Sequence, residues 1–193
     1  MRSEGRNVGW RVVWGMTVLW LAVILAGCGA LIGAGLDELV QRLGPEPITV
    51  AVDESGRAIF DFPVELATVE RVIDGDTVVL AGGERLRYIG IDTPELGTDP
   101  RECFAEQATA RNVALVAGQE VALRVDVSQR DRYQRLLRYV YLLDGTFVNA
   151  TLVAEGYATA VTFPPDVMFS DTFTRLERQA RQAGIGLWGA CAP

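Results

Sequence analysis

Five short segments rich in β-forming residues follow one another between Ala67 and Leu143, and this succession limits the possible folds more than any other feature of the sequence. Gly82-Gly83 separates the second segment from the third, and a helical segment that ends at Gly118 separates the third from the fourth. Five short strands with a helix after the third predict an α+β protein built on a five-stranded OB-fold β-barrel with about three α-helices. The expected strands are Ala67–Ile73, Thr77–Leu80, Arg85–Ile91, Glu120–Val127 and Leu136–Leu143, and the expected helices are Cys103–Val116, Val148–Glu155 and Phe169–Ala183.

The first residues of the chain have the pattern of a secretory signal. Three arginines, the last of them Arg11, precede an uncharged stretch of 25 residues, Val12–Leu36. Within it, Leu25-Ala26-Gly27-Cys28 resembles the lipobox of bacterial lipoproteins, which predicts a signal peptide over residues 1–27 and lipidation of Cys28. The alternative is an uncut membrane helix, because 25 apolar residues suffice to span a bilayer. Both interpretations place the rest of the chain outside the cytoplasm, anchored to a membrane or secreted.

Residues 28–64 are expected to form a tether and a hairpin, and residues 65–193 a single domain. A short helix is predicted at Leu36–Leu43, and Ile48–Val52 and Ala58–Phe62 flank a turn. If Cys28 carries a lipid, Cys103 and Cys191 remain as an even pair in an oxidising compartment, which favours a disulfide over two buried thiols.

The composition excludes several kinds of chemistry. The chain has no histidine, and all 18 of its basic residues are arginines. Mechanisms that need an imidazole as base, nucleophile or metal ligand are therefore excluded. The net charge of −7 argues against a generally basic nucleic-acid coat, so a nucleic-acid partner would need a local cluster of arginines.

Acidic residues occur where two predicted strands end. Asp76 lies in the turn of the segment VERVIDGDTVVL, and Asp92 and Glu95 follow the strand that contains Arg87. Pro94 stiffens the backbone between them. Four arginines lie within nine residues before the last strand: Arg130, Arg132, Arg135 and Arg138. Carboxylates beside guanidinium groups predict a site for a hard cation and a phosphate, whereas each carboxylate alone would be interpreted as a solvated turn residue.

Four ordered blocks, VIDGDTVVL, RLRYIGIDTPE, DRYQRLLRYVY and GIGLWG, resemble the staphylococcal nuclease (thermonuclease) family from about Ala67 to Gly189. The resemblance implies Ca²⁺ as cofactor, bound by Asp76, Asp92 and the carbonyl group of Thr93. It also implies that Glu95 orients or deprotonates the attacking water, and that two arginines bind the phosphate. These arginines are Arg87 and Arg135. Asp74 is expected to serve the turn.

Two departures from the family pattern affect the substrate site. Gln134 stands where the family usually has glycine, and the tyrosines of the family's nucleotide pocket are not plainly matched. Phe163 is a candidate to stack on a base, and Tyr133 is a second candidate for substrate binding, with packing as the alternative for both. Arg130, Arg132 and Arg138 are expected at the surface or in ion pairs.

The sequence thus predicts a monomeric, calcium-dependent nuclease that hydrolyses single-stranded or loosened DNA and RNA at the outer face of a membrane. In the family, cleavage leaves 3′-phosphate ends. The first alternative is a non-catalytic OB-fold module that binds nucleic acid or another anionic ligand. The second is a structural lipoprotein in which the barrel only presents the hairpin.

Overall fold

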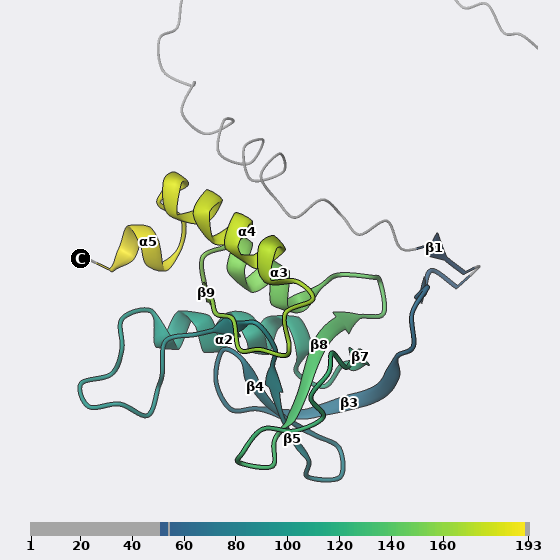
Figure 1. Ribbon diagram of the computed structural model, residues 1–193. Helices are drawn as coiled ribbons and strands as arrows, with labels where there is room; N and C mark the ends of the chain where they lie inside the picture. Colours follow the sequence, from purple (N-terminus) through teal and green to yellow (C-terminus); the bar gives the residue numbers. More distant parts are fainter. Residues whose placement is uncertain (1–50, 54, 192–193) are drawn as a thin grey trace, which may run out of the picture.

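The structure of the protein is a computed structural model that describes residues 51–53 and 55–191 (Figure 1). The predicted signal or anchor segment, Cys28 and the helix predicted at Leu36–Leu43 lie outside the described residues, as does the start of the hairpin. Among the residues that are described, no helix is both long enough and apolar enough to cross a membrane.

Five strands form a closed barrel in the order β3-β4-β5-β8-β7. Neighbouring strands of the barrel are antiparallel except β5 and β8, which are parallel. This confirms the predicted α+β class and the OB-type barrel with a helix after the third strand. The barrel strands are β3 (Glu65–Val72), β4 (Thr77–Leu80), β5 (Arg85–Tyr88), β7 (Glu120–Arg124) and β8 (Leu136–Leu142).

The alternation of side chains along β5 places the site on the outside of the barrel. Leu86 and Tyr88 are buried in the hydrophobic core, whereas Arg85 and Arg87 alternate with them and point to the other face. On β4, Thr77 pairs with Arg87 in the register, so these two residues share the outer face. Thr77 and Arg87 therefore lie together beside the turn that contains Asp74 and Asp76.

The third predicted strand, Arg85–Ile91, is interrupted. β5 ends at Tyr88, and Gly90 has φ +80° with Phe173 packed where a side chain would begin. The chain then changes direction and continues as β6 (Ile91–Asp92), which pairs with β9 (Thr159–Ala160) outside the barrel. The two short strands were not predicted, and they determine where Asp92 lies.

Three helices cover one side of the barrel, as predicted, and a single helical turn follows them (Figure 1). In the longest helix, Phe173, Leu176 and Ala180 form the buried face, at the spacing of an amphipathic helix. Gly184 ends this helix in the left-handed conformation. The helices are α2 (Ala105–Val116), α3 (Val148–Ala154), α4 (Ser170–Ala183) and the turn α5 (Leu187–Ala190).

The hairpin before the barrel consists of β1 (Ala51–Val52) and β2 (Ala58–Ile59). After it, Phe60 and Phe62 pack on Tyr141 of β8, with ring centroids 5.7 Å and 5.4 Å from the tyrosine ring. The segment that joins the hairpin to the barrel is therefore fixed by aromatic packing.

A disulfide joins Cys103 to Cys191, the pairing that the sequence analysis favoured. The two Cα atoms are 5.9 Å apart, and 88 residues of sequence separate them. The bond connects the segment that leads into α2 with the end of the α5 turn. It therefore closes a loop that contains most of the barrel domain.

Removing this disulfide should cost stability. We expect Cys191→Ala to lower the free energy of unfolding by about 4 kcal/mol, because the unfolded chain regains the entropy of a long closed loop. Guanidinium unfolding followed by circular dichroism measures the change. The double variant Cys103→Ala/Cys191→Ala should lose no more than the single variant, and an unfolding midpoint unaffected by a reducing agent would contradict the expectation.

Candidate active site

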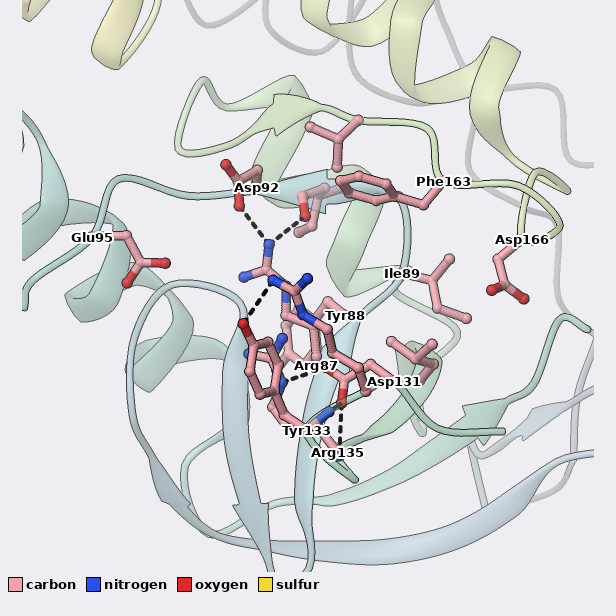
Figure 2. A pocket seen from close by; sticks show the side chains of 15 residues that line it. Arg87, Tyr88, Ile89, Asp92, Glu95, Asp131, Tyr133, Arg135, Phe163 and Asp166 are labelled. Atoms are coloured by element: carbon pink, nitrogen blue, oxygen red, sulfur yellow. Dashed lines mark hydrogen bonds and ion pairs between the residues drawn. The ribbon is translucent and has the colours of Figure 1, made fainter. Parts of the chain in front are cut away.

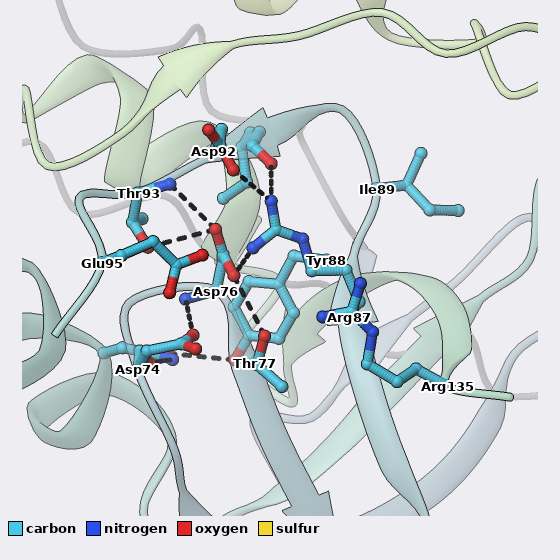
Figure 3. Close-up of polar contacts among 12 residues, drawn as sticks. Asp74, Asp76, Thr77, Arg87, Tyr88, Ile89, Asp92, Thr93, Glu95 and Arg135 are labelled. Atoms are coloured by element: carbon cyan, nitrogen blue, oxygen red, sulfur yellow. Dashed lines mark hydrogen bonds and ion pairs between the residues drawn. The ribbon is translucent and has the colours of Figure 1, made fainter. Parts of the chain in front are cut away.

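A cavity of about 570 Å³ opens on the outside of the barrel, between β5, the segment after β6 and the loops that precede β8 and α4 (Figure 2). It brings together five of the residues predicted to act on or bind the substrate. They are Arg87, Glu95, Tyr133, Arg135 and Phe163. The predicted metal ligand Asp92 also lines the cavity, whereas Asp76 lies behind it under Arg87 (Figure 3).

Asp76 is a fully buried carboxylate with several donors around it. Its Oδ2 accepts hydrogen bonds from the N–H of Thr93 at 2.8 Å and from the Thr93 hydroxyl at 3.1 Å. Its Oδ1 accepts from the hydroxyl of Thr77 at 3.1 Å and contacts the guanidinium of Arg87. A buried carboxylate is costly unless it is paired and hydrogen-bonded, and these contacts supply both conditions.

Arg87 connects Asp76, in the turn before β4, with Asp92 of β6. Its Nη1 contacts Asp76, and its Nη2 lies 2.5 Å from Oδ1 of Asp92 and donates to the carbonyl of Ile91 at 3.1 Å (Figure 3). The Asp92 side chain is half exposed, whereas that of Arg87 is only 14% exposed. One guanidinium therefore lies between a buried and an exposed carboxylate, at the edge of the cavity.

Gly75, between the two aspartates of the DGD element, permits this arrangement. A Cβ atom on Gly75 would lie 2.6 Å from the Thr93 hydroxyl oxygen, which is closer than real Cβ contacts come. Asp74 serves the turn, as predicted, because its Oδ1 accepts a hydrogen bond from the N–H of Asp76 at 3.0 Å. Asn112 of α2 fixes the same turn by donating to the carbonyl of Asp74 at 2.9 Å.

Two carboxyl groups on the acidic side of the site, Asp74 and Glu95, have raised pKa values. Burial raises the pKa of Asp74 above its usual value, although hydrogen bonds to Thr77 and the charge of Arg87 oppose the rise. Partial burial, followed by the negative charges of Asp74 and Asp92, raises the pKa of Glu95.

The residues predicted to bind Ca²⁺ lie near one another. Among the described residues, no three acidic or cysteine side chains are grouped closely enough to enclose a metal ion. The predicted set needs only two carboxylates, Asp76 and Asp92, with the carbonyl of Thr93, and the structure brings these three residues together. The Arg87 guanidinium lies between the two carboxylates. Hard oxygen ligands of this kind suit calcium.

Arg135 is positioned by a residue that the sequence analysis did not select. Oδ2 of Asp131 accepts from Nε of Arg135 at 2.6 Å, and Oδ1 accepts from the backbone N–H groups of Tyr133 and Arg135. Burial alone would raise the pKa of Asp131, but the hydrogen bonds from Arg135 and Tyr133 outweigh it, and the pKa lies below its usual value. The signal in the sequence was an aspartate four residues before the arginine, which allows an ion pair across a turn.

Gln134 adopts φ +66°, the left-handed conformation that favours glycine. This explains why the family usually has glycine at this position. The glutamine keeps the turn closed, since its N–H donates to the carbonyl of Asp131 at 3.0 Å and its own carbonyl accepts from Arg130 at 2.8 Å. The departure from the family pattern thus leaves the backbone of the turn in a conformation suited to glycine.

The cluster of four arginines does not act as one group. Arg135 and Arg132 line the cavity, whereas Arg130 forms an ion pair with Glu84 at 2.8 Å. Arg138 is buried, and it forms an ion pair with Glu65 at 3.7 Å, one of the two predicted outcomes. It also donates to the carbonyls of Gln129 and Leu137.

Two exposed aromatic side chains line the cavity (Figure 2). Phe163 is 71% exposed, which excludes the core position that the sequence left open. Tyr133 is 64% exposed, and the guanidinium groups of Arg132 and Arg135 lie 4.7 Å and 5.5 Å from its ring centroid. The buried Asp166, also missed in the sequence, accepts from the N–H groups of Val127 and Ser128 and so fixes the loop that carries Phe163.

A methyl group at Gly75 should disturb this site. We expect Gly75→Ala to lower the free energy of unfolding by about 1–3 kcal/mol, because the added Cβ forces Thr93 away from Asp76. Gly97→Ala is the matched control, since nothing lies within 4 Å of a Cβ at Gly97. Thermal unfolding of the two variants measures the difference, and equal losses would refute a tight contact at Gly75.

The chain matches the family described as Staphylococcal nuclease homologue over residues 85–190. Endonuclease YncB of Bacillus subtilis is 31% identical over 195 residues, which cover 92% of each chain. Thermonuclease of Staphylococcus intermedius is 34% identical over 125 residues, which cover 62% of this chain and 74% of that protein. The SPbeta prophage-derived endonuclease YokF of Bacillus subtilis is 38% identical over 129 residues, covering 63% of this chain and 43% of that protein.

The matched residues include most of the site, among them Arg87, Asp92, Glu95 and Arg135, and the YncB similarity extends over nearly the whole chain. The closed five-stranded barrel, the cavity on its outer face and these matches agree with one another. The chain belongs to the staphylococcal nuclease homologue family.

Proposed function

We propose that the protein is a calcium-dependent nuclease that hydrolyses phosphodiester bonds in single-stranded or loosened DNA and RNA. One observation carries this proposal. Arg87, Arg135 and Glu95 line the same open cavity, and the carboxylates of Asp76 and Asp92 contact Arg87 beside it. Relatives described as endonucleases and a thermonuclease support it.

The charges of the site suit an anionic substrate. In hydrolysis of a phosphodiester, negative charge increases on the equatorial phosphate oxygens, and the guanidinium groups of Arg87 and Arg135 can donate hydrogen bonds to such oxygens. Asp131 keeps the fork of Arg135 oriented through its bond to Nε, which leaves the terminal nitrogens for the substrate. Tyr133 and Phe163 offer exposed rings on which bases can stack.

Glu95 is the group proposed to position the attacking water. Its raised pKa favours a carboxylate that accepts a proton more readily than an ordinary surface glutamate. Asp76, Asp92 and the carbonyl of Thr93 would hold Ca²⁺, which supplies positive charge to a phosphate oxygen when bound. In the family, the reaction leaves 3′-phosphate ends, and we propose the same product here.

The proposal is tested with the full-length chain in mild detergent and labelled single-stranded DNA. We expect cleavage in millimolar calcium and none with a chelator. Glu95→Gln should lower the rate on the order of 100-fold or more, because the water loses its base. Glu106→Gln removes an exposed glutamate that pairs with Arg101, and it should leave the rate unchanged.

Three other outcomes of this assay are informative. Binding of DNA without cleavage would replace the nuclease with a non-catalytic binding module. Cleavage that survives the chelator would refute the calcium dependence. Equal losses in Glu95→Gln and Glu106→Gln would refute the role of Glu95.

We further propose that residues 1–27 are a signal peptide, that residues 28–64 tether the domain formed by 65–193, and that lipidated Cys28 attaches a monomer to the outer face of a membrane. The composition of Val12–Leu36 and the lipobox-like Leu25–Cys28 support this. Cys28→Ala, expressed in a bacterial host, should leave the protein uncut and without lipid. Mass spectrometry of the N-terminal peptide measures this, and an unmodified, uncut wild-type chain in the membrane fraction would favour the helical anchor instead.

A further inference from the structure

Two exposed arginines lie in one row across the outer face of the barrel. Arg71 of β3 and Arg85 of β5 both pair with Val79 of β4, one on each side. Directly paired residues of neighbouring strands point to the same face of a sheet. Because Val78 and Leu80 are in the core cluster, this shared face is the outside of the barrel.

The row is continuous with the cavity. Arg85 precedes Arg87 by two residues on β5, so both side chains leave the same face, about 7 Å apart along the strand. Arg87 pairs with Thr77, and Arg85 pairs with Val79, one step further from the cavity. A bound polymer that leaves the cavity beside Arg87 would therefore meet Arg85 next, and then Arg71 two strands away.

Among the arginines that the structure describes, eight have a carboxylate within 4 Å, whereas Arg71 and Arg85 do not. The adjacent Glu84 is bound by Arg130 at 2.8 Å, which removes it as a partner for Arg85. Within the part of the chain that the structure describes, no carboxylate lies within 4 Å of the guanidinium nitrogens of Arg71 or Arg85, and both residues are exposed. In a protein of net charge −7, two such residues in a row beside the cavity form a local attraction for anions.

We propose that Arg85 and Arg71 bind the phosphates of a single-stranded nucleic acid that extends out of the cavity over β5, β4 and β3. This inference rests on the proposed nuclease function and adds a second binding region for long substrates. It agrees with the general use of the second and third strands of OB-fold barrels for oligonucleotide binding. It also explains how an acidic protein can retain a polyanion, since the contacts to the phosphates are local.

The test compares two double variants of the full-length chain that remove the same charge. Arg71→Gln/Arg85→Gln removes the row, and Arg175→Gln/Arg178→Gln removes two exposed arginines of α4 that also have no carboxylate within 4 Å among the described residues. Binding of a labelled long single-stranded oligonucleotide is measured by fluorescence anisotropy with a chelator present, over a range of salt concentrations. Cleavage of the long oligonucleotide and of a dinucleotide is then measured in calcium.

We expect the first variant to bind the long oligonucleotide several-fold more weakly, with the slope of log K against log salt smaller in magnitude by about 1.4, or about 0.7 for each lost phosphate contact. Its kcat, and its KM for the dinucleotide, should equal those of the wild type. The α4 variant should behave like the wild type throughout. Equal weakening in both double variants would overturn the proposal in favour of overall charge, and an unchanged salt slope in the first variant would also overturn it.

The readouts separate this inference from the proposed function. If the wild type binds the oligonucleotide through the row but cuts neither substrate, the row stands and the nuclease function fails. If the wild type cuts both substrates and the row variant matches it, the nuclease stands and the row fails. A wild type that neither binds nor cuts overturns both.

Discussion

The buried carboxylate of Asp76 is the interaction on which the site depends. It lies at the end of the turn before β4, yet it accepts two hydrogen bonds from Thr93, which follows β6. An unpaired charge in this position would cost several kcal/mol, so the contacts with Thr93 and Arg87 stabilise the fold. The requirement to satisfy one carboxylate thus brings together two segments that the sequence separates by 17 residues, and Asp92 and Glu95 follow because they flank Thr93.

Several contacts fix the segment after β6, although it lies outside the barrel. Thr93 bonds to Asp76 at its start, the N–H of Glu95 donates to Glu102 at 2.9 Å, and Cys103 is joined to Cys191 at its end. β9 adds a fourth contact by pairing with Asp92. An irregular segment can present a proton-accepting side chain at a fixed place only if its ends are fixed, and here a buried charge, a short sheet and a covalent bond fix them.

Much of the fold was predictable because it follows local periodicity, but the site was predictable only in part. The barrel strands and the three long helices follow from alternating or helical patterns and glycine turns. β6 and β9 were missed because two-residue strands have no periodicity, and they exist only through their mutual pairing, Ile91 with Ala160 and Asp92 with Thr159. Asp131 was missed because an aspartate in an arginine-rich turn resembles a solvated residue. Gly75 and Gln134 show most clearly what the sequence alone cannot predict. The close approach of Thr93 to Gly75 and the left-handed φ of Gln134 are properties of the folded chain.

The absence of histidine and lysine explains how the positive charge is distributed. A guanidinium keeps its charge when buried and offers donors in several directions, so Arg87 can contact Asp76, Asp92 and the carbonyl of Ile91 at once. A lysine has three donors on one point charge and would lose its proton more readily in the same place. The chain has 25 acidic residues against 18 arginines, and among the arginines that the structure describes, eight have a carboxylate within 4 Å. An unpaired arginine is informative about function only together with its place, which is why Arg71 and Arg85, in one row with Arg87, differ from Arg175 and Arg178 on α4.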